Sequence, residues 1–136
     1  MIKKILSNYQ RLKEDNNSDS IFYSSPRLVN HLDQSFRNRL TNLYRKRINS
    51  ESTVLDLMSS WNSHLPDNIN YHRVIGHGLN TIELENNKRL DSFWVQDLNI
   101  SQKLPLDEQS IDVILIVASW QYLQYPESLA LELSRV

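Results

Sequence analysis

The chain has 136 residues, about one domain, and its composition of 40% hydrophobic and 23% charged residues is ordinary for a globular protein. Its net charge of −1 gives no indication of a nucleic-acid partner, and the absence of cysteine excludes disulfides and thiolate metal sites. The only glycines, Gly76 and Gly78, are too few for a phosphate-binding glycine loop.

The first 20 residues are polar and include the run Asp15-Asn16-Asn17-Ser18-Asp19-Ser20. We therefore expect a flexible N-terminal tail over residues 1–20. Lys3 and Lys4 are not followed by the apolar segment of a secretory signal, and no apolar run in the sequence reaches membrane-spanning length. These observations favour a cytoplasmic protein that does not use a membrane.

A helical pattern begins at Pro26, which suits the first turn of a helix. Apolar residues then recur at steps of three and four up to Tyr44, as on one face of a helix. Cations at positions 45–47 would complement the dipole at its end. The sequence predicts an N-terminal helix over residues 26–48. Its basic end could bind phosphate, but a solvated helix end is the favoured interpretation.

Four apolar runs predict strands at residues 53–58, 70–75, 93–96 and 111–117. Helices are expected between and after them, over 80–87, with Asn80 or Thr81 as the N-cap, and over 126–136. Strands that alternate with helices predict a parallel sheet with covered faces. We therefore expect one α/β domain over residues 21–136, a Rossmann-like open parallel sheet of about four strands preceded by the helical segment.

Three polar groups follow the predicted strands. They are Asp56 with Ser59 and Ser60, Gly76-His77-Gly78-Leu79-Asn80, and Asp97-Leu98-Asn99. Parallel strands bring their carboxyl ends to one edge of the sheet, where ligands bind in such folds. Backbone N–H groups after the first strand could hold a carboxylate or ribose oxygens, Asn80 a sugar hydroxyl, and Asp97 an adenine amino group with Leu98 on the ring. The set suits an adenosyl ligand without phosphates.

Structural roles compete with each of these assignments. Asp56 could cap its own loop, Asn80 could serve only as an N-cap, and Asp97 could form a turn at a strand end. No histidine stands at metal-ligand spacing with a carboxylate, so we expect no metal site. The catalytic base, if there is one, is unknown.

Several motifs in this order resemble those of class I S-adenosylmethionine-dependent methyltransferases. They are Val54-Leu55-Asp56-Leu57-Met58-Ser59-Ser60-Trp61, Val74-Ile75-Gly76-His77-Gly78, Gln96-Asp97-Leu98, Leu104-Pro105-Leu106 and Ser110-Ile111-Asp112-Val113-Ile114. The likeness is greatest to a glycine-poor branch of the type-11-like group. Residues 22–33 also resemble the segment that precedes this core, so that the resemblance covers about residues 22–136.

The resemblance implies an open seven-stranded sheet with S-adenosylmethionine at the ends of its first four strands. The methionine and ribose part would be lined by Asp56, Met58, Ser59, Ser60 and Trp61. In the second motif, Gly76 and Gly78 belong to the cofactor site, with Gly78 where many relatives carry a ribose-binding acid and Asn80 as its substitute. Asp97 and Leu98 would frame the adenine, and Ser119 with Trp120 would lie near the transferred methyl group. The methyl acceptor is unknown.

Two departures from the family bear on activity. Met58 and Ser60 stand where the first loop of relatives has glycines, and the sequence stops after the helix that follows the fourth strand. The fourth strand would then be an open sheet edge, available to a second copy or to another chain. The alternative function is a non-catalytic interaction module, and the sequence is also compatible with a fragment of a longer product.

Overall fold

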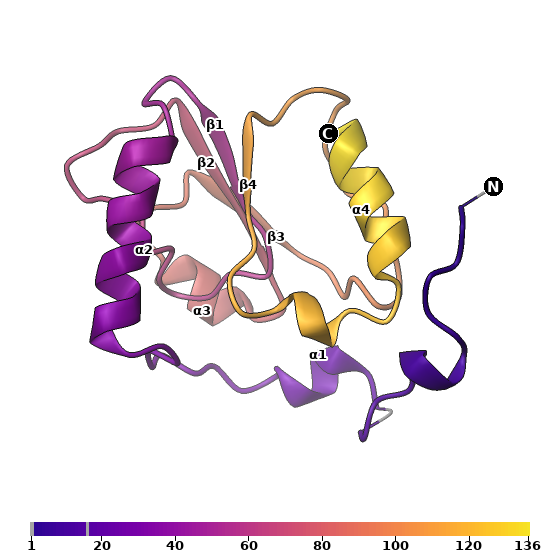
Figure 1. The fold of residues 1–136 in the computed structure, drawn as a ribbon. Helices are drawn as coiled ribbons and strands as arrows, with labels where there is room; N and C mark the ends of the chain where they lie inside the picture. The colour runs from indigo at the N-terminus through magenta and orange to yellow at the C-terminus, as the bar shows by residue number, and fades with distance from the viewer. Residues whose placement is uncertain (1, 16) are drawn as a thin grey trace.

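A computed structural model describes residues 2–15 and 17–136 (Figure 1). Its elements in chain order are η1 (Tyr9–Arg11), α1 (Asp19–Phe22), α2 (Gln34–Arg47), β1 (Thr53–Asp56), β2 (Arg73–Gly78), α3 (Thr81–Glu85), β3 (Ser92–Val95), β4 (Val113–Leu115), η2 (Trp120–Tyr122) and α4 (Pro126–Arg135). The four strands of this described part form one sheet in the order β3-β2-β1-β4, and every neighbouring pair is parallel. The predicted Rossmann-like α/β fold with a preceding helix is confirmed.

The central strand β1 carries the most deeply buried residues of the sheet. Val54 and Leu55 are fully buried because β1 lies between β2 and β4 and is covered on both faces. In register, Asp56 lies opposite Gly76 of β2 and Leu115 of β4. The strand ends therefore meet at one edge of the sheet.

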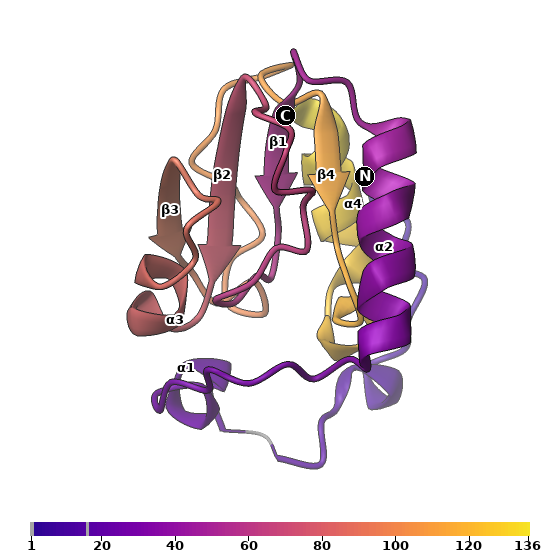
Figure 2. The ribbon, with the colours of Figure 1, turned by 90° about the vertical axis from the view of Figure 1, so that its left-hand side faces the viewer.

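Helices α2 and α4 lie on opposite faces of the sheet (Figure 2), and an apolar cluster packs on each face. On one face, Tyr44 and Ile48 at the end of α2 pack with Val54 and Val74. On the other face, α4 contributes Leu129 to a cluster that also contains Leu55, Leu57, Ile75, Leu98 and Leu104. The successive residues Val54 and Leu55 of β1 thus belong to opposite clusters, because neighbouring side chains of a strand point to opposite faces of the sheet.

The helix predicted over residues 26–48 corresponds to α2, which is shorter and begins at Gln34. Asp33 is its N-cap, and the Asp33 carboxylate accepts the backbone N–H of Phe36 at 2.8 Å. Residues 26–33 are not helical. The apolar spacing at Leu28 and Val29 is therefore not part of the helical stripe, and both side chains are exposed.

The second strand lies later in the chain than predicted, over Arg73–Gly78 instead of residues 70–75. Gly76, His77 and Gly78 are consequently inside β2 and not in a loop after it. Strands β1 and β4 are shorter than their apolar runs, since β1 ends at Asp56 and β4 covers Val113–Leu115, while β3 begins and ends one residue earlier than predicted. Asn80, one of the two predicted N-caps, caps α3, which is shorter than the helix predicted over residues 80–87.

Part of the predicted tail contacts the domain. Arg11 is buried, donates to the carbonyl of Gln124 at 2.5 Å and forms an ion pair with Glu127 at the start of α4. Met1 and Asn16 of this tail lie outside the described residues, and its flexibility stays a prediction. None of the described helices combines the length and the apolar character that crossing a bilayer requires.

Candidate functional site

The carboxyl ends of the strands form the candidate site. Figure 2 shows the four strands with their tips pointing toward α1. Asp56 ends β1, Gly78 ends β2, Asp97 follows β3 by two residues and Ser119 follows β4 by four. The sheet therefore gathers at one edge the polar groups that the sequence placed after separate strands.

Asp56 is buried at the tip of β1 and receives a hydrogen bond from the Ser59 hydroxyl at 2.6 Å. Burial raises the pKa of Asp56 from 3.8 to about 6, and hydrogen bonds from Ser59 and Ser63 oppose that rise. Asp56 therefore accepts a hydrogen bond from its own loop, as the structural alternative expected, and its charge changes around pH 6.

His77 connects three strand ends. The backbone N–H of Met58 donates to Nδ1 of His77 at 3.0 Å, so that the proton of the ring is on Nε2, which donates to the carbonyl of Gln96 at 2.8 Å. Burial lowers the pKa of His77 from 6.5 to about 4. A neutral imidazole thus bridges the loop after β1 to the end of β3. Sequence analysis did not assign this role, although a histidine between two glycines in an apolar strand was a signal.

Gly78 allows the loop after β1 to lie directly on β2. A Cβ at this position would be 2.7 Å from the carbonyl oxygen of Ser59, and the Ser59 N–H donates to the carbonyl of His77 at 2.6 Å. Met58 turns the chain at this point with a φ of 56°, in the left-handed region that favours glycine. The loop therefore has the backbone shape of a glycine-containing turn without its glycines.

Two buried hydroxyls at this edge have no hydrogen-bond partner within the described part of the chain. They are Ser60 Oγ, after β1, and Ser119 Oγ, after the adjacent strand β4. Buried polar groups in native proteins are nearly always paired, so an unpaired hydroxyl calls for a ligand or a bound water. Ala118, next to Ser119, has a φ of 53° and turns the chain sharply behind β4.

The remaining predicted site residues are partly or fully engaged. The Asn80 oxygen accepts the N–H of Glu83, while its NH₂ group donates to the carbonyls of Tyr23 and Ser24 at 3.0 and 3.2 Å. Asp97 accepts the N–H of Asn99 at 2.9 Å, as a turn former does. Leu98 is buried in the cluster that faces α4, and Gly76 lies against the Leu90 side chain.

Residues 18–30, called the N-terminal strap below, cross the sheet edge beneath the strand tips (Figure 2). The strap includes α1, and strand-tip residues bind it along its length. Its hydrogen bonds join Ser18 to Asp97, Asp19 to Asn99, Tyr23 and Ser24 to Asn80, Arg27 to Glu83, Val29 to Trp61, and Asn30 to Asn62. The sequence did not indicate that the strap would cover the candidate site.

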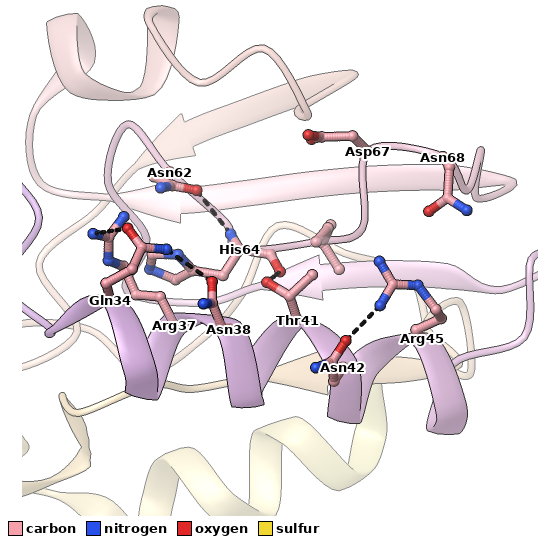
Figure 3. Close-up of a pocket in the computed structure, with 11 residues that line it drawn as sticks. Gln34, Arg37, Asn38, Thr41, Asn42, Arg45, Asn62, His64, Asp67 and Asn68 are labelled. Carbon is pink, nitrogen blue, oxygen red and sulfur yellow. Dashed lines mark hydrogen bonds between the residues drawn. The ribbon is translucent and has the colours of Figure 1, made fainter.

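A cavity of about 570 Å³ lies away from the strand tips, between α2 and the loop over residues 62–68 (Figure 3). Its walls are polar and include Arg37, Arg45 and His64. Within residues 2–15 and 17–136, no three His, Asp or Glu side chains come close enough together to hold a metal ion.

No protein-family model and no curated protein matches the chain. Among solved structures, it matches a chain of the complex between the Haloferax volcanii Trm112 methyltransferase activator and a candidate methyltransferase, with a TM-score of 0.59 and 23% sequence identity. The match covers 74% of this chain and 46% of that chain, so this chain spans less than half the length of its neighbour. At this identity the likeness shows a methyltransferase-like fold.

Proposed function

We propose that the strand-tip edge binds S-adenosylmethionine and that the chain is part of a methyltransferase-like protein of the type-11 group. The observation that carries the proposal is the pair of buried hydroxyls, those of Ser60 and Ser119, that have no hydrogen-bond partner among the described residues. Each serine follows one of the adjacent strands β1 and β4 by four residues. Ligands of open α/β sheets bind at this edge. The fold likeness to a candidate methyltransferase supports the same function.

The residues at this edge divide into two roles. Ser60, Ser119 and Asp97 would bind polar atoms of the cofactor, while Met58, Ser59 and Gly78 fix the loop that carries Ser60. Asn80 keeps one lone pair on its oxygen for a ribose hydroxyl, besides its bonds to Glu83 and the strap. When bound, the cofactor would supply a methyl group for attack by an acceptor nucleophile, with S-adenosylhomocysteine as the leaving group. The chain contributes mainly alignment and the exclusion of water by the strap.

Calorimetry with S-adenosylhomocysteine tests this proposal. We expect saturable binding, weakened about tenfold in Ser60→Ala and in Ser119→Ala, because each variant removes a hydrogen bond to a buried hydroxyl. Ser110→Ala is the matched control, since Ser110 is exposed and precedes β4 at the opposite end of the strand. The absence of heat and of a thermal shift at millimolar ligand would reject cofactor binding.

A second candidate function is an interaction module that uses β4. This strand pairs only with β1 in the described sheet, so its other side is an open edge. The neighbour is known from a complex with an activator protein, which favours a protein partner for this fold as well. Light scattering distinguishes the two functions: a mass that rises with concentration to that of a dimer supports pairing between copies, and a monomer at high concentration contradicts it.

A further inference from the structure

The cavity between α2 and the loop over residues 62–68 has the chemistry of an anion site (Figure 3). It lies next to the strand-tip edge, with which it shares Asn62, but contains none of the proposed cofactor-binding residues. Its volume of about 570 Å³ is in the range of small-molecule sites. The lining residues come from one face of α2 and from the loop that follows Trp61.

Positive charge is concentrated on this side of the molecule although the chain is nearly neutral. Helix α2 carries five cations and no acid in its 14 residues. Two of these cations, Arg37 and Arg45, line the cavity. Neither forms an ion pair with any carboxylate in the described part of the chain, and the one acid in the lining, Asp67, forms none either. Neither guanidinium is therefore neutralised by an ion pair among the described residues, although the Arg37 guanidinium also donates to the Leu32 carbonyl at 3.1 Å and to the Gln34 side chain at 2.8 Å.

His64 adds a third donor from the opposite wall. The Thr41 hydroxyl on α2 donates to the His64 carbonyl at 2.7 Å, and the His64 N–H donates to the Asn62 side chain at 2.9 Å. His64 has a φ of 57°, a strained conformation that the surrounding bonds maintain. Burial, with the nearby charge of Arg37, lowers its pKa. Figure 3 shows the imidazole beside the Arg37 guanidinium.

Side-chain amides complete the lining with uncharged donors. Asn38 accepts from Gln34 at 2.8 Å and Asn42 accepts from Arg45 at 2.6 Å, each through its oxygen. Among the described residues, neither NH₂ group has a hydrogen-bond partner. These groups can donate to phosphate oxygens or sugar hydroxyls, while the arginines supply the charge.

We propose that this cavity binds a phosphorylated small molecule of nucleotide size. Arg37 and His64 contact a phosphate, and the amides of Asn38 and Asn42 bind the polar body of the ligand. Arg45 lies eight residues beyond Arg37 on the same helix, about 12 Å along its axis, and contacts a second anionic or carbonyl group. The phosphate dominates recognition because a guanidinium binds it through charge-assisted, bidentate bonds.

The proposal is tested by NMR titrations with ADP, adenosine and inorganic phosphate. The arginine side-chain signals and the backbone signals are recorded at constant ionic strength. We expect ADP to shift the signals of Arg37, His64 and Arg45 saturably, and inorganic phosphate to shift those of Arg37 and His64 more weakly. Adenosine, without a phosphate, should leave them unchanged. Shifts by adenosine equal to those by ADP, or no shifts at millimolar ADP, would overturn the proposal.

Variants separate specific binding from general attraction to a basic helix. Arg37→Gln and Arg45→Gln should each weaken ADP binding about tenfold or more, since each removes a charge-assisted bond. Arg39→Gln removes the same charge from α2 outside the cavity and should change the affinity for ADP by no more than about twofold. Arg45 is exposed, so its variant tests the site even if Arg37→Gln unfolds. Equal losses in all three variants contradict a built site.

S-adenosylhomocysteine distinguishes the two proposals. ADP binding in the α2 cavity should be unaffected by saturating S-adenosylhomocysteine, because the strand-tip edge is a different surface. Displacement of ADP by S-adenosylhomocysteine would assign the nucleotide to the strand tips and overturn the cavity proposal. Retention of ADP binding in a chain that does not bind S-adenosylhomocysteine would support the cavity and reject only the cofactor site.

Discussion

At the scale of single residues, the candidate site contains two buried groups whose pKa values move in opposite directions. Burial raises the pKa of Asp56 from 3.8 to about 6 and lowers that of His77 from 6.5 to about 4. In both cases burial favours the neutral form. The folded protein therefore keeps a protonated Asp56 and a neutral His77 over a shared interval of pH.

Their effects on stability have opposite signs. Asp56 contributes stability that is present below pH 3.8 and is lost as the pH rises through about 6. His77 contributes stability that is present above pH 6.5 and is lost as the pH falls through about 4. Each effect is about 3 kcal/mol from the size of its shift. The contributions of these two groups to the free energy of unfolding should therefore nearly cancel between pH 4 and 6.

Asp56→Asn removes one of the two opposing effects. Between pH 4 and 6.5, the free energy of unfolding of this variant should rise by about 3 kcal/mol more than that of the native chain, because the opposing titration of Asp56 is removed. Urea denaturation at intervals of pH measures this slope. His77→Gln should give a slope of the opposite sign, and equal slopes in the two variants would contradict the pairing of these effects.

At the scale of elements, the two glycines of β2 have different neighbours. A Cβ on Gly78 would meet the backbone oxygen of Ser59 at 2.7 Å, whereas a Cβ on Gly76 would meet the end of the Leu90 side chain. Backbone in a short loop cannot move without disturbing the Met58 turn and the His77 bridge. A leucine side chain can change rotamer instead.

Gly78→Ala should therefore lower the free energy of unfolding by about 1–3 kcal/mol, and Gly76→Ala by less. Urea denaturation of both variants measures the difference, with Gly76→Ala as the matched control. Gly78→Ala should also displace the amide signals of Met58 and Ser59 in an NMR spectrum. A larger loss for Gly76→Ala would mean that the loop after β1 adapts more readily than Leu90.

The elements were predictable where their signal is local. Alternation of apolar runs with helical patterns was enough to predict the parallel sheet, and capping residues were enough to predict the start of α3 to within one residue, with Asn80 or Thr81 as its N-cap. Asp33 was an equally local signal for α2, but Pro26 and the apolar spacing at Leu28 outweighed it. Gly76 and Gly78 were taken for a loop because glycine is rare inside strands. Glycine suits these positions of β2 because Ser59 and Leu90 approach the strand closely. The periodicity of the sequence gives no sign of these contacts.

At the scale of the whole molecule, the strap joins the start of the chain to the tips of its strands. Asn80 caps α3 and donates to the carbonyls of Tyr23 and Ser24. The polar composition of residues 15–20 favoured a free tail, and the bonds that hold the strap connect residues more than 30 positions apart. Such contacts leave no pattern in a single sequence, which is why the cover over the candidate site was not predicted.

Asn80→Ala should release the strap. We expect faster chymotrypsin cleavage after Tyr23, because the substitution removes both side-chain hydrogen bonds that hold this turn. Asp33→Ala is the matched control. This variant also removes an N-cap, that of α2, but Asp33 takes no part in the hydrogen bonds between the strap and the strand tips. Equal cleavage of the two variants would indicate that loss of a helix cap, and not of the strap bonds, exposes Tyr23.

The long sequence separation of the strap contacts has a consequence for biosynthesis. Ser18 and Asp19 leave the ribosome long before Asp97 and Asn99, to which they bind, and Arg11 precedes its partner Glu127 by 116 positions. Closing such wide loops is slow, so the nascent chain must assemble its sheet first. The strap and Arg11 should thus reach their native places after the strands and helix to which they bind.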